Sequence, residues 1–201
     1  MKLYYSPAAC SLSPHIVARE AGIALTLEKV DTKTHKTADG KDFYGINPKG
    51  YVPVLELDDG SLLTEGPAIV QYLADSKPAS RLVPANGTME RYRQQEWLNF
   101  ITAELHKPLG NLFAPNASPE LRAATVERLS GRFEFVAKAL AGKQYLMGEF
   151  SAADAYLFVV LNWTNFLKID LSKWPVLKEY MGRVASRPAV TEALKAEGLT
   201  K

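Results

Sequence analysis

Residues 53–64 read PVLELDDGSLLT, and this stretch decides the fold of the first third of the chain. Two short apolar runs flank the pair Asp59-Gly60. An Asp-Gly pair between apolar runs supplies the positive φ angles of a tight turn between antiparallel strands. We therefore expect a β-hairpin here. Residues Gly66 to Ala74 then return to helical spacing, so the whole segment is predicted to be ββα.

The residues before the hairpin predict a second unit of strand, helix and strand. Lys2–Tyr5 is a short apolar strand, Ser11–Ala21 has its apolar residues on one helical side, and Leu25–Val30 alternates imperfectly as a strand. Residues Asp31–Asp42 have little pattern and are interpreted as loop and a weak helix. The order βαβ, α, ββα matches a thioredoxin-like layout, an α+β fold with a mixed four-stranded sheet.

The second part of the chain is predicted to be all-helical. Residues 76–88 hold two prolines and a glycine among small polar residues, which is typical of a linker. Beyond them, apolar residues recur every three or four positions in Met89–Leu105, Pro119–Leu140, Ser151–Leu167 and Trp174–Arg187. We expect one domain over residues 1–77, a linker over 78–88 and an all-α domain over 89–201.

One helix start is marked clearly by Ser151-Ala-Ala-Asp154. A serine hydroxyl at the cap and an acidic side chain three residues later can satisfy each other's backbone amides. This capping box is expected to specify folding, and replacing Asp154 with alanine is expected to cost about 0.5–2 kcal/mol.

Composition excludes several classes of function. The 201 residues are 47% hydrophobic and 23% charged with a net charge of +2, and no basic cluster suited to nucleic acid is present. The longest apolar stretch, Ala155–Leu161, falls short of the roughly 20 residues that cross a bilayer. One cysteine forms no internal disulfide, and three histidines fit no metal-ligand spacing. We expect a cytoplasmic protein with no metal, no nucleic-acid partner and no membrane.

The single cysteine, Cys10, lies where the first strand turns into the first helix. Unpaired amides and the helix dipole at such a position favour the thiolate, which is the nucleophilic form. The alternative is a small, buried, apolar cysteine without chemistry. Position alone leaves both interpretations open.

Several motifs in register resemble those of the cytosolic glutathione transferases. They are NPKGYVPVL at residues 47–55, LTEGPAI at residues 63–69 and the capping box at Ser151. Cys10 and the run ELHK at residues 104–107 are similar to the bacterial beta class in particular. The resemblance spans essentially the whole chain. It implies a homodimeric enzyme that uses glutathione as co-substrate, needs no prosthetic group and conjugates glutathione to hydrophobic electrophiles in detoxification.

The resemblance also implies a glutathione site in the first domain. The Val52-Pro53 bond is a candidate cis peptide whose backbone would pair with the cysteinyl part of glutathione. Glu65 and Gly66 begin a helix, where amides bind the γ-glutamyl carboxylate and the Glu65 side chain holds the ammonium. Gly66 stands where many relatives carry serine, so one hydrogen bond is in doubt. His35 stands where lysine often approaches the glycine carboxylate.

The helical domain is expected to complete the site. In beta-class relatives the histidine that matches His106 approaches the sulfur, so Cys10 and His106 are the predicted catalytic residues. At separations of seven and three residues, Asn99 and Ala103 share a helical face with His106. By resemblance the remaining glutathione contacts are Asn99, Ala103, Glu104, Leu105 and Lys107. The predicted pocket for the electrophile contains Tyr5, Phe113, Tyr156 and Trp163, although aromatic residues at helical spacing often belong to the core.

Alternative chemistries remain open. Tyr4, Tyr5 or Ser11 would activate the sulfur if a hydroxyl takes that role, and Ser11 is the strongest rival. Cys10 would form a mixed disulfide with glutathione if the enzyme is a thiol reductase or a reductive dehalogenase. A ligandin-like carrier of hydrophobic compounds and a regulatory interaction protein are the two readings without turnover.

Overall fold

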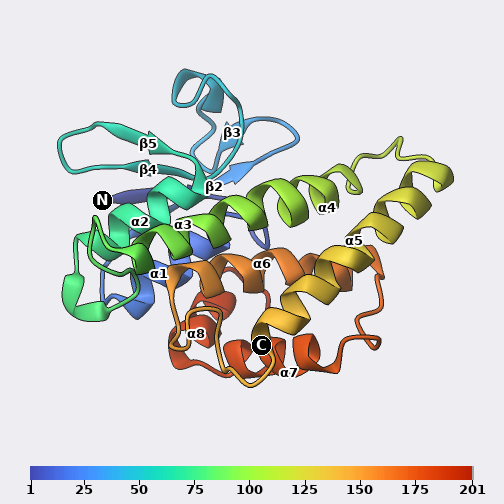
Figure 1. Ribbon diagram of the computed structural model, residues 1–201. Coiled ribbons are helices and arrows are strands. Elements are labelled where there is room, and N and C mark those ends of the chain that lie inside the picture. Colours follow the sequence, from blue (N-terminus) through green and yellow to red (C-terminus); the bar gives the residue numbers. More distant parts are fainter. Residues whose placement is uncertain (201) are drawn as a thin grey trace. The chain divides into compact units, whose positions relative to one another are not determined.

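The structure is a computed structural model that describes residues 1–200, and its contacts divide the chain into two compact units (Figure 1). The first unit contains residues 1–83 together with the residues from Arg187 onward. Its elements are β1 (Lys2–Tyr5), α1 (Leu12–Glu20), β2 (Thr26–Asp31), β3 (Lys36–Thr37), η1 (Phe43–Gly45), β4 (Val54–Glu56), β5 (Leu62–Thr64), α2 (Gly66–Asp75), η2 (Pro78–Ser80) and α8 (Pro188–Ala196).

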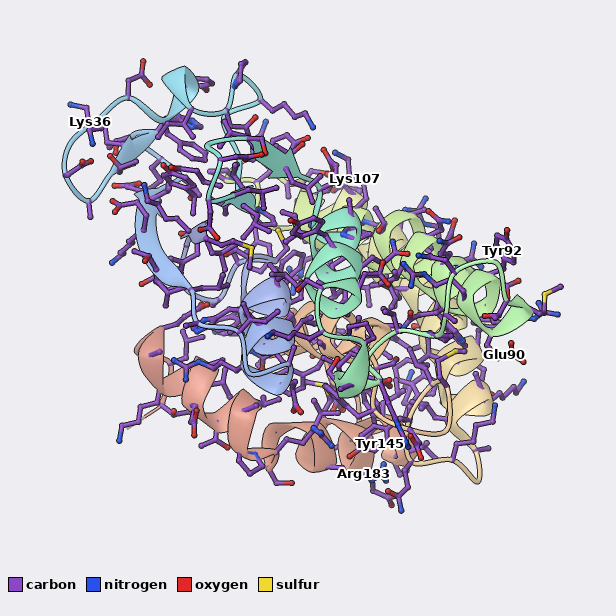
Figure 2. All side chains as sticks on the ribbon, turned by 90° about the vertical axis from the view of Figure 1, so that its left-hand side faces the viewer. Lys36, Glu90, Tyr92, Lys107, Tyr145 and Arg183 are labelled. Atoms are coloured by element: carbon purple, nitrogen blue, oxygen red, sulfur yellow. The ribbon has the colours of Figure 1, made fainter. Side chains whose placement is uncertain are left out.

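The sheet of the first unit has the strand order β3-β2-β1-β4-β5. β1 pairs in parallel with β2, whereas all the other pairs are antiparallel, so the predicted mixed sheet and β4–β5 hairpin are confirmed. The prediction of four strands is wrong by one, because Lys36 and Thr37 pair with the end of β2 as β3. Figure 2 shows the Lys36 side chain at this outer edge of the sheet. The weak helix predicted before Asp42 is replaced by β3 and, after it, by the short 3₁₀ helix η1.

Helices cover the sheet of the first unit and enclose its core. Leu3, Val54 and Leu55 of the central strands are fully buried. α1 packs against α2, and the C-terminal helix α8 packs against α1. The Arg187 guanidinium, just before α8, donates two hydrogen bonds of 2.7 and 2.8 Å to the Glu20 carboxylate at the end of α1. The C-terminal residues therefore fold with the first unit.

The second unit, residues 84–186, is entirely helical in its regular elements, as predicted. It contains α3 (Met89–Phe100), the π-helix η3 (Ile101–His106), α4 (Lys107–Asn111), α5 (Pro119–Leu140), α6 (Ala152–Leu167) and α7 (Pro175–Ala185). In Figure 1, α3 runs through η3 into α4 as one continuous helical rod. No helix within residues 1–200 combines the length and the hydropathy that crossing a bilayer requires.

α6 is the central helix of this unit. Nearly every residue from Ala152 to Leu161 is buried, and α6 contacts α3, η3, α4 and α7. Its start confirms the predicted capping box: the Asp154 carboxylate accepts hydrogen bonds from the Ser151 amide at 3.0 Å and from the Ser151 hydroxyl at 2.7 Å. A helix that is apolar on all sides must be surrounded by others, so α6 fixes the positions of the side chains that it directs toward η3.

Candidate functional site

Cys10 lies in the turn between β1 and α1, two residues before the helix begins at Leu12. The half-buried thiol donates a hydrogen bond of 3.4 Å to the Val52 carbonyl. Burial raises the pKa of the Cys10 thiol to about 12, and the amides of Cys10 and Ser11 lower it by less. Of the two interpretations that the sequence leaves open, this structure favours the protonated thiol, because the sulfur precedes the first helical turn and burial shifts its pKa further than the amides do.

Two of the three rival hydroxyls, those of Ser11 and Tyr4, are hydrogen-bonded to other groups. The buried Ser11 hydroxyl accepts from the Ser6 amide at 3.1 Å and donates to the Ser6 carbonyl at 3.2 Å, which braces the β1–α1 turn. The Tyr4 hydroxyl donates to Glu56 at 2.6 Å. Burial raises the pKa of Tyr5, so its phenol stays protonated. The sequence offered one thiol and three hydroxyls as candidates to act on the sulfur of glutathione. Among them, the Cys10 thiol is the group with a hydrogen bond to the Val52 backbone.

The Val52-Pro53 peptide bond is cis, as predicted. The bend before it is held by the Asn47 side-chain amide, which donates to the Tyr51 carbonyl at 2.7 Å. The Gly50 backbone has a φ of +72°, and a β-carbon at that position would lie 2.5 Å from the Tyr44 ring. Only glycine fits both requirements, so this bend is built for one backbone path.

Glu65 is the N-cap of α2, with a φ of +70°, an uncommon conformation for a residue with a β-carbon. Its carboxylate accepts from the Lys49 ammonium at 2.6 Å and from the Tyr51 hydroxyl at 2.9 Å. Pro67 has no amide hydrogen. The amides of residues 68 and 69 both donate to the Glu65 carbonyl, so Gly66 carries the amide left at the helix start for an anion.

His35 packs beside this same bend. Its Nδ1 lies 2.8 Å from the Gly50 carbonyl oxygen, and its ring centroid lies 4.6 Å from that of Tyr44. A carbonyl oxygen only accepts, so Nδ1 is the nitrogen that carries the hydrogen. The bend is thus contacted from three sides. His35 and Cys10 are hydrogen-bonded to the carbonyl oxygens of Gly50 and Val52, and the Glu65 carboxylate is hydrogen-bonded to the Tyr51 hydroxyl.

In the second unit, His106 ends the π-helix η3 and is half-buried. Its Nδ1 is hydrogen-bonded to the Tyr156 hydroxyl at 2.5 Å. Trp163 meets the His106 ring edge-on at 4.8 Å between centroids, and Phe113 meets Trp163 at 5.7 Å. Three of the four aromatic residues predicted for an apolar pocket therefore gather around His106. Tyr156 and Trp163 are buried, whereas Phe113 is 47% exposed.

The π-helix changes which residues share a face with His106. The Lys107 amide donates to the Thr102 carbonyl, five residues back, so this turn holds more residues than an α-helical turn. The spacing that placed Asn99 and Ala103 in line with His106 assumed α-helical geometry throughout, and the structure departs from that geometry over Ile101–His106. Sequence periodicity contains no signal for this change, because one π turn is too short to alter the pattern.

The other residues of the ELHK run have separate environments. Leu105 is fully buried, so any contact that it makes with glutathione would come from its backbone. The Glu104 carboxylate accepts from Arg132 of α5 at 2.6 Å, which ties η3 to α5. Lys107, the first residue of α4, is exposed, and it is labelled in Figure 2. His106 is therefore the member of the run that packs against the aromatic rings of Tyr156 and Trp163.

Lys49 and Tyr51 were not predicted as site residues, although both lie in the NPKGYVPVL motif. Their contacts with Glu65 show why they belong here. The available signal was their position, because a cation and a phenol stand on either side of Gly50 within a motif already assigned to the site.

Two family models match the chain. The one described as "Glutathione S-transferase, N-terminal domain" matches residues 8–76, and the one described as "Glutathione S-transferase, C-terminal domain" matches residues 97–188. Among curated proteins, Glutathione S-transferase GstA of Escherichia coli O157:H7 is 45% identical over 200 residues, which is 99% of this chain and 100% of that protein. Glutathione S-transferase GST-4.5 of Xanthomonas campestris is 35% identical over 208 residues, 99% of this chain and 100% of that protein.

Solved structures are similar over the same length. The ternary complex of BphK, described as a bacterial GST, has a TM-score of 0.97 and 56% identity, and covers 99% of this chain and 100% of its own. A sphingomonad glutathione S-transferase complexed with glutathione has a TM-score of 0.95 and 48% identity, with both chains fully covered. The beta-class enzyme of Sphingomonas chungbukensis gives 0.96 and 48%, also with full coverage of both chains.

Proposed function

Because this chain belongs to the glutathione S-transferase family, and a beta-class enzyme is among the solved structures that it resembles, we propose that it conjugates reduced glutathione to hydrophobic electrophiles. The observation that carries this proposal is the grouping of three different polar functions around one bend: the Val52 backbone, the Glu65 carboxylate and the Gly66 amide. These match the peptide, ammonium and carboxylate groups of an extended γ-glutamyl peptide.

We propose that glutathione lies along the cis-Pro53 bend of the first unit. The Gly66 amide at the start of α2 binds the γ-glutamyl carboxylate, since a helix N-terminus favours an anion. Glu65 binds the ammonium group, and Lys49 and Tyr51 hold its carboxylate in place before the ligand arrives. The His35 ring, as the imidazolium, donates its Nε2–H to the glycine carboxylate, because its Nδ1–H is already donated to the Gly50 carbonyl.

The proposed reaction begins with ionisation of the bound thiol. The S–H bond breaks as His106 takes the proton, and the thiolate then attacks the electrophilic carbon, with the leaving group departing as an anion where there is one. Lys107, exposed beside His106, adds positive potential. Of the aromatic residues around His106, the exposed Phe113 supplies apolar surface for the electrophile, and the buried Trp163 supports its ring. Cys10, protonated at neutral pH because its pKa is about 12, acts as a hydrogen-bond donor to sulfur.

Thiol exchange through Cys10 is the second candidate function. The observation that favours it is that the Cys10 thiol contacts the Val52 carbonyl, on the backbone proposed to bind the cysteinyl part, and that the residue as a whole is only partly buried. A relative described as the disulfide-bond oxidoreductase YfcG of Escherichia coli is 29% identical over 211 residues. The raised pKa of Cys10 opposes this function, because the thiolate is the attacking species.

We further propose a cytoplasmic homodimer. The support is an aromatic cluster on the surface of the second unit, formed by Trp97 and Phe100 of α3 and by Phe135 of α5, with centroids 4.9 to 5.8 Å apart. Phe135 is 51% exposed, and Tyr92 of the same α3 helix, labelled in Figure 2, is 56% exposed. Exposed aromatic groups of this size mark contact surfaces. Phe135→Asp should yield monomers in analytical ultracentrifugation, and an unchanged dimer would exclude this patch as the interface.

The test of the proposed function combines binding and turnover. Calorimetry with reduced glutathione should register binding, and a chromogenic aryl halide should be conjugated by the same preparation. Mass spectrometry of the protein after incubation with oxidised glutathione then separates the two candidates, since exchange leaves a glutathionyl adduct on Cys10. Binding without turnover of an aryl halide, peroxide or disulfide panel would favour the carrier.

A further inference from the structure

His35 lies in the turn between β2 and β3, and its backbone has a φ of +53°. This left-handed conformation is uncommon for a residue with a β-carbon, and residues held in it cluster at functional sites. The Asp31 carboxylate braces the turn, because it accepts from the Lys33 amide at 2.8 Å and from the Thr34 amide at 3.2 Å. The His35 carbonyl accepts from the Phe43 amide at 2.8 Å, so the backbone of His35 is fixed.

The two ring nitrogens of His35 have different surroundings. Nδ1 donates its hydrogen to the Gly50 carbonyl at 2.8 Å. Nε2 has no hydrogen-bond partner among residues 1–200. Since Nδ1 keeps its hydrogen, Nε2 carries a lone pair in the neutral ring and a hydrogen in the imidazolium. Nε2 can therefore donate to a carboxylate only when His35 is charged.

Tyr44 packs against both partners of the hydrogen bond between His35 and Gly50. The rings of Tyr44 and His35 have centroids 4.6 Å apart and planes inclined by 35°. The Tyr44 ring also covers Gly50, where an added β-carbon would lie 2.5 Å from a carbon of that ring. Rotation of the His35 ring away from Gly50 would thus disturb the contact with Tyr44 as well as the hydrogen bond.

The 3₁₀ helix η1 holds Tyr44 in this place. Its first residue, Phe43, is fully buried and packs against the Tyr4 ring with 5.8 Å between centroids, so η1 is anchored to the core of the first unit. The Asp42 carboxylate caps η1 by accepting from the Tyr44 amide at 3.0 Å. Tyr44 itself is 47% exposed. Its ring therefore reaches His35 from a fixed backbone while it remains at the surface.

From this cluster we infer that Tyr44 is a positioning residue that holds His35 so that its Nε2 meets the glycine carboxylate of glutathione. The inference rests on the proposed function, in which glutathione lies along the cis-Pro53 bend. It deepens that function by making ligand specificity depend on the Tyr44 ring and on the charge of His35. The site should prefer a free glycine carboxylate over an amide when His35 is charged, and it should lose this preference when His35 is neutral.

The other titratable groups around His35 are exposed or engaged with one another. Apart from Tyr44, those within residues 31–51 are Asp31, Lys33, Lys36, Asp39, Lys41, Asp42, Lys49 and Tyr51. The first and last aspartates accept backbone amides, Asp39 pairs with Lys41 at 2.6 Å, and both groups of the bend are bonded to Glu65. Lys33 and Lys36 are exposed, and Figure 2 labels Lys36. Within residues 1–200, Tyr44 is the titratable group with a ring contact to His35.

The experiment is calorimetry with S-methylglutathione and with its glycine amide, which differ only in the charge at the glycine end. Neither ligand has an ionisable thiol. The charge of histidine changes between about pH 5 and 8, so both Kd values are measured at about pH 5.5 and about pH 8. We expect the carboxylate to bind about tenfold more tightly than the amide at the lower pH and about equally at the higher pH. A ratio that is the same at both pH values would overturn the inference.

The variants separate the ring of Tyr44 from the charge of His35. Tyr44→Ala should lower the ratio at about pH 5.5 to about twofold, whereas Tyr44→Phe keeps the ring and should behave as the wild type. An unchanged ratio in Tyr44→Ala, or a ratio lost in Tyr44→Phe, would contradict the role of Tyr44. His35→Lys keeps a cation at both pH values and should retain the preference at both. A preference that still falls with pH in His35→Lys would assign the effect to another group.

Tyr72→Ala is the matched control, because Tyr72 of α2 is an exposed tyrosine of the same unit. We expect its ratio to equal that of the wild type, and a lowered ratio would refute the assignment to Tyr44. A merely structural role of Tyr44 would weaken binding of the carboxylate and the amide alike, which leaves the ratio unchanged. Failure of the proposed function is read separately, since neither ligand would then bind at either pH.

Discussion

Replacing Asp154 with alanine should destabilise the protein by more than the loss of an exposed helix cap. The Asp154 side chain is fully buried and accepts hydrogen bonds from the Leu146 amide at 2.9 Å and the Ser151 amide at 3.0 Å. It also accepts from the hydroxyls of Ser151 and Tyr180. The hydroxyls can turn to other acceptors, and Tyr180 already lies 3.1 Å from the Asp154 backbone carbonyl, which alanine retains.

The magnitude of the loss follows from the backbone amides of Leu146 and Ser151, which lose their hydrogen-bond acceptor in the variant. Each buried amide left without a partner costs about 1–3 kcal/mol, so Asp154→Ala should lower the free energy of unfolding by about 2–6 kcal/mol. This exceeds the about 0.5–2 kcal/mol of an ordinary cap. Urea unfolding at neutral pH measures it, with Ser151→Ala, expected to cost about 1 kcal/mol, as the smaller matched change.

The same carboxylate should give stability a pH dependence. Burial raises the pKa of Asp154 from 3.8 to about 6. Between those values the folded state binds a proton that the unfolded state has lost, so the contribution of Asp154 to stability falls as pH rises through this window and levels off above it. Two pKa units correspond to about 3 kcal/mol. Asp154→Asn should lack this slope. A cost below about 1 kcal/mol for Asp154→Ala, or parallel pH profiles for the wild type and Asp154→Asn, would refute the reasoning.

Three further predictions concern the first unit. Glu65→Gln removes the charge proposed to hold the ammonium of glutathione and should weaken its binding about 10- to 100-fold in calorimetry, whereas an unchanged Kd would remove Glu65 from the site. Because burial raises the pKa of Cys10 to about 12, its alkylation by iodoacetamide should accelerate about tenfold per pH unit from about pH 7 to 9, and a rate that levels off in this range would show an activated thiol. Gly50→Ala should cost about 1–3 kcal/mol, because its φ is positive and a β-carbon would lie 2.5 Å from the Tyr44 ring; an unchanged melting temperature would argue against this bend.

Local chemistry accounts for the parts of the fold that were predictable. The Asp59-Gly60 turn allows only a tight hairpin, and β4 and β5 form it. β3 was missed because two residues are too few to show a periodic pattern, and its pairing with β2 depends on tertiary structure. The sequence analysis placed the residues of α8 in the all-α domain over residues 89–201, because nothing in their sequence identifies α1 as their partner, and their place in the first unit required the structure.

The site divides in a similar way. The cis bond and the role of the cap at Glu65 were expected from the resemblance to the glutathione transferases, since the sequence around Pro53 alone favours the commoner trans isomer. The charge state of Cys10 was not, because helix-end amides and burial shift its pKa in opposite directions and only coordinates show which effect is larger. The π-helix was invisible for a different reason: it leaves the hydrophobic spacing intact while it changes the direction of His106.

The most direct measurement of the central claim is the ultraviolet absorbance of thiolate when glutathione is added to Cys10→Ala, in which glutathione is the only thiol present. S-methylglutathione, which binds without an ionisable sulfur, is the control. We expect a thiolate band that titrates clearly below about pH 8.5, the pKa of an unperturbed cysteine thiol. A band that appears only at that pH, or none above the control, would contradict the claim that this chain binds glutathione and ionises its sulfur.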